Sequence, residues 1–484
     1  MNDNNQKLFA EFPSVSTEDW EAKIDADLKG KDYERALVWR TYEGIKVKPY
    51  YREESLSDLD YLNSLPGEFP FTRGTKITND WLIRQDIFVQ DFESANKKAL
   101  SILGKGVNSL GFYFDCRSDV SIENLTTLLK DINLEACEVN FVCPCKKCNC
   151  VEVFTKYGNA SNFDNKLIVA SSAVNPIGNL ILKGKFEEGS EEKVFANVKQ
   201  LVEDSDILPN YRVIGVNGKV FGNSGSSIVQ ELAFSLAQGA EYLVRLTDKG
   251  LSPDEVSNNI KFNFSISNNY FMEIAKLRAA RLLWAQIVKA FNIENVSSAL
   301  MLTHCETGNY NKTLYDPHVN MLRTQTEAMS AALGGADSIT VQAFDSVFNS
   351  PSDFSERIAR NQQILLKEES YFDKAVDPGA GSYYIENLTN SIAEEAWNLF
   401  IQVQDMGGFI AAFREGFIQG EINSVAGKRD INIAMHKENL LGTNQFPNFA
   451  ERVDTELDSS LFKPQDLTEK EAEIETLKPY RGAQ

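Results

Sequence analysis

Four cysteines stand close together in the sequence FVCPCKKCNC, where they form a C-x-C-x2-C-x-C run: Cys143, Cys145, Cys148 and Cys150. Thiolates are soft ligands that suit zinc or an iron–sulfur cluster, and neighbouring lysines lower the pKa of a thiol. However, structural zinc sites usually take their ligands from two separated pairs. The spacing therefore favours reduced thiols on a surface loop over a metal site, and both interpretations stay open.

Composition and charge exclude several classes of protein. The 484 residues are 43% hydrophobic and 24% charged, which is typical of a globular chain, and seven cysteines are too few for a disulfide scaffold. The net charge of −20 repels phosphate backbones and anionic lipids. There is neither an apolar run of membrane-spanning length nor a signal peptide at the N-terminus. We expect a cytoplasmic protein that binds neither nucleic acid nor membrane.

Repeated strand–loop–helix units must position the polar residues. The pattern predicts strands at 211–216, 297–303 and 339–344, and helices at 231–249, 269–291, 319–333 and 355–369. Such α/β units, with polar residues just after the strands, favour a (β/α)8 TIM barrel, with an open doubly wound sheet as the alternative. The usual nucleotide-binding glycine motifs do not occur. We expect an N-terminal arm at 1–50, the barrel at 51–450 and a charged C-terminal linker at 451–484.

Several segments closely resemble the methylmalonyl-CoA mutase family. They are YFMEIAKLRAARLLWA at 270–285, DPGAGSYYIE at 377–386, RIARNQQILLKEES at 357–370, PGEFPFTRG at 66–74 and LGTNQFPN at 441–448. The resemblance implies an isomerase of propionate metabolism that interconverts methylmalonyl-CoA and succinyl-CoA by a radical carbon-skeleton rearrangement. In that family the barrel holds acyl-CoA along its axis, and a separate C-terminal domain binds adenosylcobalamin.

The residues at the family's catalytic positions differ in this chain. Asp86 stands where the family's W-T-I-R-Q-Y segment has its tyrosine, and Val220, preceded by Lys219, stands where the family has the histidine of a Tyr-His pair. In the segment that resembles R-T-H-C-Q-T, Leu302 replaces the arginine and Glu306 replaces the glutamine. These four changes remove donors or positive charge that an anionic acyl-CoA would need. We therefore expect no catalytic residues and a degenerate site.

Other residues could form a vestigial acyl-CoA pocket. The candidates are Arg84, Gln85, Arg278, Arg281 and His304. For Arg278 and Arg281, contact with CoA phosphates competes with salt bridging at the barrel rim. A satisfied buried histidine is an equally good interpretation of His304. The glycines, proline and tyrosines of the 377–386 segment are expected to be structural.

The resemblance also bears on the cofactor. The family's cobalamin-ligand motif D-x-H-x-x-G is incomplete around His318, because Met321 occupies the final glycine position. We therefore expect this chain to bind no cofactor and to contain no C-terminal cobalamin-binding domain. We expect adenosylcobalamin in a partner subunit.

Together these features predict the small, catalytically inactive and structural subunit of a heterodimeric methylmalonyl-CoA mutase. The large catalytic subunit would be its partner, acyl-CoA would bind weakly if at all, and an arm rich in aromatic residues (Trp20, Trp39, Tyr42 and Tyr50) would cover the partner. A divergent acyl-CoA mutase substrate subunit that uses a separate cobalamin-binding subunit is the alternative. A third hypothesis is a barrel recruited for binding or assembly through the cysteine run.

Overall fold

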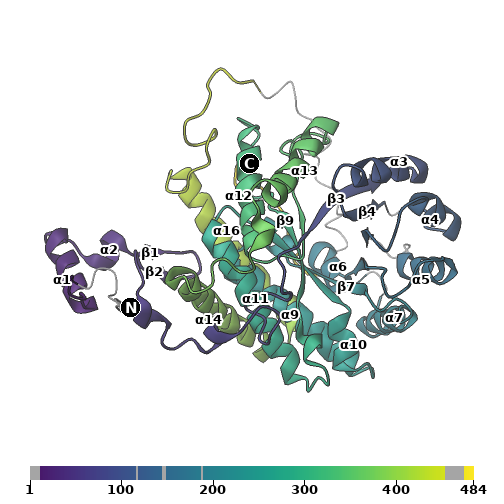
Figure 1. Ribbon diagram of the computed structural model, residues 1–484, viewed down its shortest axis with the longest axis horizontal. Helices are drawn as coiled ribbons and strands as arrows, with labels where there is room; N and C mark the ends of the chain where they lie inside the picture. Colours follow the sequence, from purple (N-terminus) through teal and green to yellow (C-terminus); the bar gives the residue numbers. More distant parts are fainter. Residues whose placement is uncertain (1–10, 116–117, 144–148, 187–188, 453–473, 484) are drawn as a thin grey trace, which may run out of the picture.

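Eight parallel strands close into a barrel (Figure 1). The computed structural model describes residues 11–115, 118–143, 149–186, 189–452 and 474–483. The strands are β3 (Leu82–Val89), β4 (Ser109–Phe114), β5 (Glu138–Val142), β6 (Ala170–Val174), β7 (Tyr211–Asn217), β8 (Ile260–Ile266), β9 (Leu302–Thr307) and β10 (Ser338–Thr340). Because β10 pairs with both β9 and β3, the sheet is closed. The predicted TIM barrel is confirmed, and the open-sheet alternative is wrong.

Helices follow the strands and cover the outside of the barrel (Figure 1). Those between the strands are α3 (Phe92–Leu103), α4 (Ile122–Leu129), α5 (Cys150–Ala160), α6 (Pro176–Lys183), α7 (Glu191–Asp204), α8 (Lys219–Asn223), α9 (Ile228–Thr247), α10 (Pro253–Asn258), α11 (Tyr270–Ala290) and α12 (Val319–Leu333). Those after β10 are α13 (Asp353–Glu368), α14 (Tyr383–Asp405), α15 (Phe409–Arg414) and α16 (Phe417–Ala434).

The helix boundaries follow from local capping. The predicted helix at 319–333 is α12, with the same first and last residues. Helix α9 begins before the predicted position, because Ser227 and Gln230 form a reciprocal capping box at its N-terminus. The apolar pattern marks the buried face of a helix, whereas the cap decides where the helix begins.

The second predicted strand was misplaced. A strand was expected at 297–303, but Val296–Ala299 forms a 3-10 turn and β9 runs from Leu302 to Thr307. The polar residues His304 and Glu306 were taken as a loop. They belong to the strand because the barrel interior is polar at this point, so a polar residue can face inward. Strand β10 is also shorter than predicted.

The barrel and its helices pack closely around aromatic side chains. The ring of Trp284 on α11 meets the ring of Phe262 on β8 edge to face, with centroids 4.8 Å apart. A Cβ at position 239 of α9 would lie 2.8 Å from Trp284 and 2.9 Å from Phe262. Gly239 is therefore needed for α9 to approach this pair.

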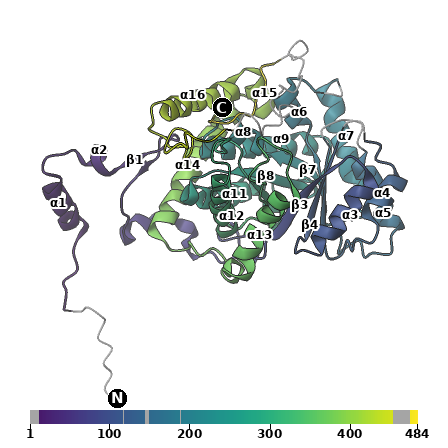
Figure 2. The ribbon, with the colours of Figure 1, turned by 90° about the horizontal axis from the view of Figure 1, so that it is seen from above.

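The N-terminal segment projects away from the barrel (Figure 2). It carries α1 (Thr17–Leu28) and α2 (Tyr33–Leu37), neither of which has a buried residue, and a small hairpin of β1 (Trp39–Arg40) and β2 (Lys46–Val47). Ile45 and Val47 of the hairpin join the hydrophobic core. The arm is thus fixed to the barrel at its base while its helices contribute no core.

Near the other end of the chain, residues 474–483 pack on the barrel. The side chain of Leu477 is 3% exposed, and the backbone amides of Leu477, Tyr480 and Gly482 donate to carbonyls of the barrel and its loops. This segment crosses the loops that follow β7 and β9, because its acceptors there are Asn223 and Tyr310. Among the described helices, none is both long and apolar enough to cross a membrane.

Candidate functional site

The first charged pair of the barrel interior lies on β3. Arg84 and Asp86 share one face of the strand, and Arg84 Nε donates to Asp86 Oδ1 at 2.7 Å. The neighbouring residue on β4 is Gly111, where a Cβ would lie 1.9 Å from Asp86 Oδ1. Only glycine leaves the space that this ion pair occupies.

A second charged pair joins two positions at which the resemblance led us to expect other residues. Lys219, at the start of α8, forms an ion pair with Glu306 of β9, and Gln342 Nε2 donates to the other oxygen of Glu306 at 2.8 Å. Burial opposes the charge of Lys219, but Glu306 more than compensates and raises its pKa. Lys219 and Glu306 therefore neutralise each other. Nearby, burial and then the charge of Asp86 raise the pKa of Tyr113 to about 12.

A third charged pair connects β5 and β8 across the interior. Lys261 Nζ lies 2.7 Å from Glu138 Oε1 and 2.8 Å from Asn140 Oδ1. Burial alone would raise the pKa of Glu138, but Lys261 and hydrogen bonds from Ser109 and Asn140 lower it to about 2. Ser171 on β6 completes this group by donating to Asn140 at 2.6 Å.

His304 lies in the barrel interior with one of its two ring nitrogens lacking a hydrogen-bond partner among the described residues. Its Nδ1 is 2.9 Å from Ser338 Oγ on β10, and its Nε2 is buried without a partner among the described residues. Burial and then the charges of Arg84 and Lys261 hold its pKa well below the usual range. The imidazole is therefore neutral. Leu302 lies on the same face of β9, in register with Lys261 of β8.

These contacts leave the interior electrically balanced. Arg84, Lys219 and Lys261 each have a carboxylate partner within the barrel. Two of those carboxylates, Asp86 and Glu306, stand at positions where the resemblance led us to expect substrate-binding groups. In the part of the chain that the structure describes, these three pairs leave no surplus positive charge for an acyl anion.

The structure separates Gln85 from the interior residues. Strand alternation turns it to the outer face of β3, where Gln85 Nε2 donates to Glu356 Oε2 and Arg360 donates to Gln85 Oε1. Both partners lie on α13. The inclusion of Gln85 in an interior pocket was therefore wrong, because adjacent residues of a strand face opposite sides.

Arg278 and Arg281 also lie away from the interior, on α11. Arg278 is fully buried, with Nη2 2.8 Å from Glu386 and Nη1 donating to Thr389. Arg281 donates to the backbone carbonyls of Phe71, Thr72 and Gly334. Their grouping with a CoA pocket was wrong, and the ion-pair interpretation holds for Arg278. These contacts join the segments at 66–74, 270–285 and 377–386, which supports a structural role for the last.

The cysteine run is only partly described. Cys145 and Cys148 lie outside the described residues. Cys143 is disulfide-bonded, so the expectation of a reduced thiol is wrong for this residue. Cys150 is a reduced thiol, as expected, but it is buried in the first turn of α5 and does not lie on the surface. Within the described ranges, no cluster of three or more residues that could hold a metal ion occurs.

The three histidines lie in separate parts of the fold. His304 is enclosed in the barrel, with one ring nitrogen bonded to Ser338. His318 precedes α12, and its ring lies 5.3 Å from that of Phe344. His436 follows α16 in a left-handed backbone conformation. The expectation that this chain binds no cofactor stays a prediction.

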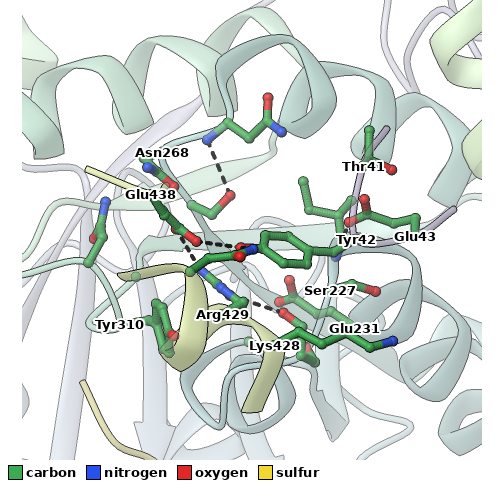
Figure 3. Close-up of a pocket in the computed structure, with 18 of the residues that line it drawn as sticks. Thr41, Tyr42, Glu43, Ser227, Glu231, Asn268, Tyr310, Lys428, Arg429 and Glu438 are labelled. Atoms are coloured by element: carbon green, nitrogen blue, oxygen red, sulfur yellow. Dashed lines mark hydrogen bonds and ion pairs between the residues drawn. The ribbon is translucent and has the colours of Figure 1, made fainter. Parts of the chain in front are cut away.

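A cavity of about 860 Å³, which the sequence did not reveal, lies between the base of the arm and the barrel (Figure 3). Residues 39–44 of the arm, the loop before α9, the loops after β8 and β9, and residues 428–438 line it. Tyr42 reaches across it to donate to Glu438 Oε2 at 2.7 Å. The glycine- and serine-rich loop at 222–227 is visible in the sequence as part of the cavity wall. A local sequence pattern does not show, however, that the arm packs over this loop.

Comparison with known proteins gives a consistent picture. A family model described as methylmalonyl-CoA mutase matches residues 40–122 and 118–484. A protein named methylmalonyl-CoA mutase small subunit, from Porphyromonas gingivalis, is 49% identical over 92% of this chain and 72% of its own length. Methylmalonyl-CoA mutases of Rhizobium meliloti and of human mitochondria are 33% and 31% identical over 88% of this chain. The chain spans 63% and 60% of their lengths.

Proposed function

Because the chain belongs to the methylmalonyl-CoA mutase family, we propose that it is the small, non-catalytic subunit of a heterodimeric methylmalonyl-CoA mutase. The assembled enzyme would interconvert methylmalonyl-CoA and succinyl-CoA in propionate metabolism. The relative named as a small subunit supports this assignment. Its sequence is 49% identical to this chain, whereas that of the Rhizobium meliloti methylmalonyl-CoA mutase is 33% identical.

The observation that carries the proposal is the pairing of charges inside the barrel. Asp86 is held by Arg84, and Glu306 is held by Lys219. An acyl-CoA whose acyl group carries a carboxylate would meet two carboxylates whose cationic partners are already engaged. A barrel with this interior is suited to a structural role beside a catalytic chain.

The partner in this proposal is a large subunit that binds both acyl-CoA and adenosylcobalamin. The incomplete D-x-H-x-x-G motif around His318, with Met321 at the final glycine position, supports a cofactor held elsewhere. The arm supports a subunit contact, because Trp20 and Trp39 are 48% and 46% exposed and its helices bury no residue. Exposed tryptophans are enriched at protein interfaces.

One observation favours the alternative, a divergent acyl-CoA mutase substrate subunit with a separate cobalamin-binding subunit. Nε2 of the neutral His304 ring has no partner among the described residues, and such a nitrogen could hydrogen-bond a ligand that carries no negative charge. This function would require a substrate whose migrating group lacks a carboxylate.

The experiment that tests the proposal is recovery of the tagged chain from its own cells at moderate salt. We expect a stoichiometric, larger chain with the absorption spectrum of cobalamin, identified by mass spectrometry. A short cobalamin-binding protein would support the alternative, and the absence of any partner would overturn the heterodimer.

A second measurement addresses the lack of catalysis. The purified chain, mixed with adenosylcobalamin and methylmalonyl-CoA, should form no succinyl-CoA, whereas the recovered complex should form it. Turnover by the chain without the larger subunit would contradict a purely structural role.

A further inference from the structure

Three aromatic rings and one guanidinium form a continuous row beside the cavity at the base of the arm. The guanidinium carbon of Arg429, on α16, lies 5.9 Å from the ring centroid of Tyr42 on the arm and 3.7 Å from that of Tyr310, in the loop after β9 (Figure 3). The ring of Tyr480 meets the ring of Tyr310 edge to face, with centroids 5.4 Å apart. The row therefore joins the arm to the C-terminal segment, residues 474–483, through α16 and a barrel loop.

At the arm end of this row, the chain spans the cavity. Residues 39–44 line the cavity, whereas the part of the arm that is buried in the core begins at Ile45. Tyr42 is held by side chains of α16 and the turn after it: its hydroxyl donates to Glu438 at 2.7 Å and accepts from Asn432 at 2.8 Å. A segment that spans a cavity and is held by a few side chains can open locally without unfolding of the barrel.

At the other end of the row, the C-terminal segment packs on a small cluster of its own. Tyr310, Ile433 and Leu440 form a hydrophobic cluster separate from the main core, and Tyr480 packs against it. The backbone amides of Tyr480 and Gly482 donate to carbonyls of the loops after β7 and β9, each at 2.9 Å. Because this cluster is separate from the main core, the segment can loosen while the barrel stays folded.

Arg429 is held in place between the two ends. Its side chain is 12% exposed, its Nη1 donates to the Ser226 carbonyl at 3.3 Å, and its Nη2 lies 3.8 Å from Glu438 Oε1. Glu438 also accepts from Tyr42, so the group that holds the arm also orients the guanidinium. A cation is attracted to an aromatic ring more strongly when it is shielded from water. Departure of Tyr42 would therefore expose the guanidinium and weaken its contact with Tyr310.

We propose that Arg429 couples the base of the arm to the C-terminal segment, so that opening of residues 39–44 loosens residues 474–483. The two states are the arm base closed on Arg429 and the arm base lifted from it. Coupling between two sites is reciprocal, so loosening of the C-terminal segment also weakens the hold on the arm. If the arm contacts a larger subunit, as proposed above, this link would transmit the contact to the C-terminal segment. The coupling itself belongs to this chain and is tested without a partner.

The test is hydrogen–deuterium exchange of the full chain, followed by mass spectrometry of the peptides that contain the reporting amides. Tyr42→Ala should raise the exchange rates of the Tyr480 and Gly482 amides at least about threefold, because the contact between Arg429 and Tyr310 is weakened. In the other direction, Tyr480→Ala should raise by a similar factor the exchange rate of the Thr41 amide, which donates within the arm. Unchanged exchange in either direction would overturn the coupling.

Tyr50→Ala is the matched control for Tyr42→Ala. Tyr50 is also on the arm, but its ring packs against Trp20 and it does not line the cavity. Its removal should leave exchange of the Tyr480 and Gly482 amides unchanged. The amides of β4 report on global unfolding and should keep their exchange rates in every variant, and circular dichroism verifies the fold. An equal effect of Tyr50→Ala would show that any loss in the arm loosens the segment, which would overturn a specific link.

A double-mutant cycle tests whether Arg429 is the link. Arg429→Gln alone should raise exchange both in the C-terminal segment and at the base of the arm, since it interrupts the row in the middle. In the Arg429→Gln chain, Tyr42→Ala should cause no further increase at the Tyr480 and Gly482 amides. A full, additive effect of Tyr42→Ala in that chain would show that the coupling does not pass through Arg429, and the assignment would be overturned.

Discussion

At the scale of single residues, the buried charges inside the barrel neutralise one another in pairs. Lys219 and Glu306 both differ from the pattern that the family resemblance led us to expect, yet they neutralise each other. Asp86 is likewise neutralised by Arg84, in space that Gly111 leaves open. The substitutions thus form a consistent polar core and not a set of unrelated losses.

Gly111 provides a first prediction at this scale. Gly111→Ala should lower the free energy of unfolding by about 1–3 kcal/mol, because the new Cβ would lie 1.9 Å from Asp86 Oδ1 and the ion pair must shift. Urea denaturation measures the change. The control is Gly420→Ala in α16, where no atom lies within 4 Å and a gain of up to about 1 kcal/mol is expected. Equal effects of the two changes would contradict the close fit.

Glu138 provides a second prediction, on pH. Its pKa in the folded chain is lowered to about 2, below the unfolded value of about 4.3, so the stabilisation is complete above the unfolded value and is lost as the pH falls toward 2. The loss from this group should be on the order of 3 kcal/mol.

The measurement is the free energy of unfolding as a function of pH for the unmodified chain and for Glu138→Gln. The glutamine does not titrate, so the difference between the two curves should shrink as the pH falls from about 5 to about 2. A difference that stays constant over this range would show that Glu138 does not have a lowered pKa.

At the scale of elements, the arm divides into a base and a distal part. Helices α1 and α2 bury no residue, whereas Ile45 and Val47 belong to the core. The base also carries Tyr42 and Glu43, which accept hydrogen bonds from Asn432 of α16 and Ile228 of α9. Deletions that end before residue 38 should therefore affect the stability of the barrel less than deletions that extend beyond it.

Two truncations test this division. Deletion of residues 1–37 should leave the thermal midpoint nearly unchanged but abolish recovery of the proposed partner. Deletion of residues 1–47 should destabilise the barrel, by about 1.5–3 kcal/mol for each apolar side chain removed from the core. Thermal unfolding followed by circular dichroism distinguishes them. If the shorter deletion also destabilised the chain strongly, the arm would be part of the folded core.

At the scale of the whole molecule, segments far apart in the sequence are joined by buried charges. Arg73, Arg278, Asp377 and Glu386 connect the chain before β3 with α11 and the start of α14. All four side chains are at most 7% exposed. Three of the segments that resemble the family are thus joined to one another by buried ion pairs on the outside of the barrel.

Removal of one member of this network should be costly. Arg278→Met should lower the free energy of unfolding by about 3–5 kcal/mol, because Glu386 would keep a buried charge with fewer partners. The matched control is Arg245→Met, whose side chain is 38% exposed and pairs with Glu241 and Glu191, with an expected loss below about 1 kcal/mol. Chemical denaturation measures both. Similar losses would show that burial of the network contributes little.

The sequence by itself determined the barrel, most of its later elements and the family, because apolar periodicity and local motifs are properties of short segments. Helix α12 and strand β7 were predicted nearly residue by residue for this reason. The resemblance also led us to expect changes at four catalytic positions of the family, since the identity of a residue needs no geometry.

Only the tertiary structure decided how these residues are grouped. Gln85 faces α13, Arg278 binds Glu386, and Lys219 pairs with Glu306, although these partners are separated by more than 80 residues. The cavity between the arm and α9 has the same origin, because the hydrogen bond from Ile228 to Glu43 joins residues 185 positions apart in the sequence. Side-chain direction and long-range contact depend on strand register and helix packing, which no local pattern specifies.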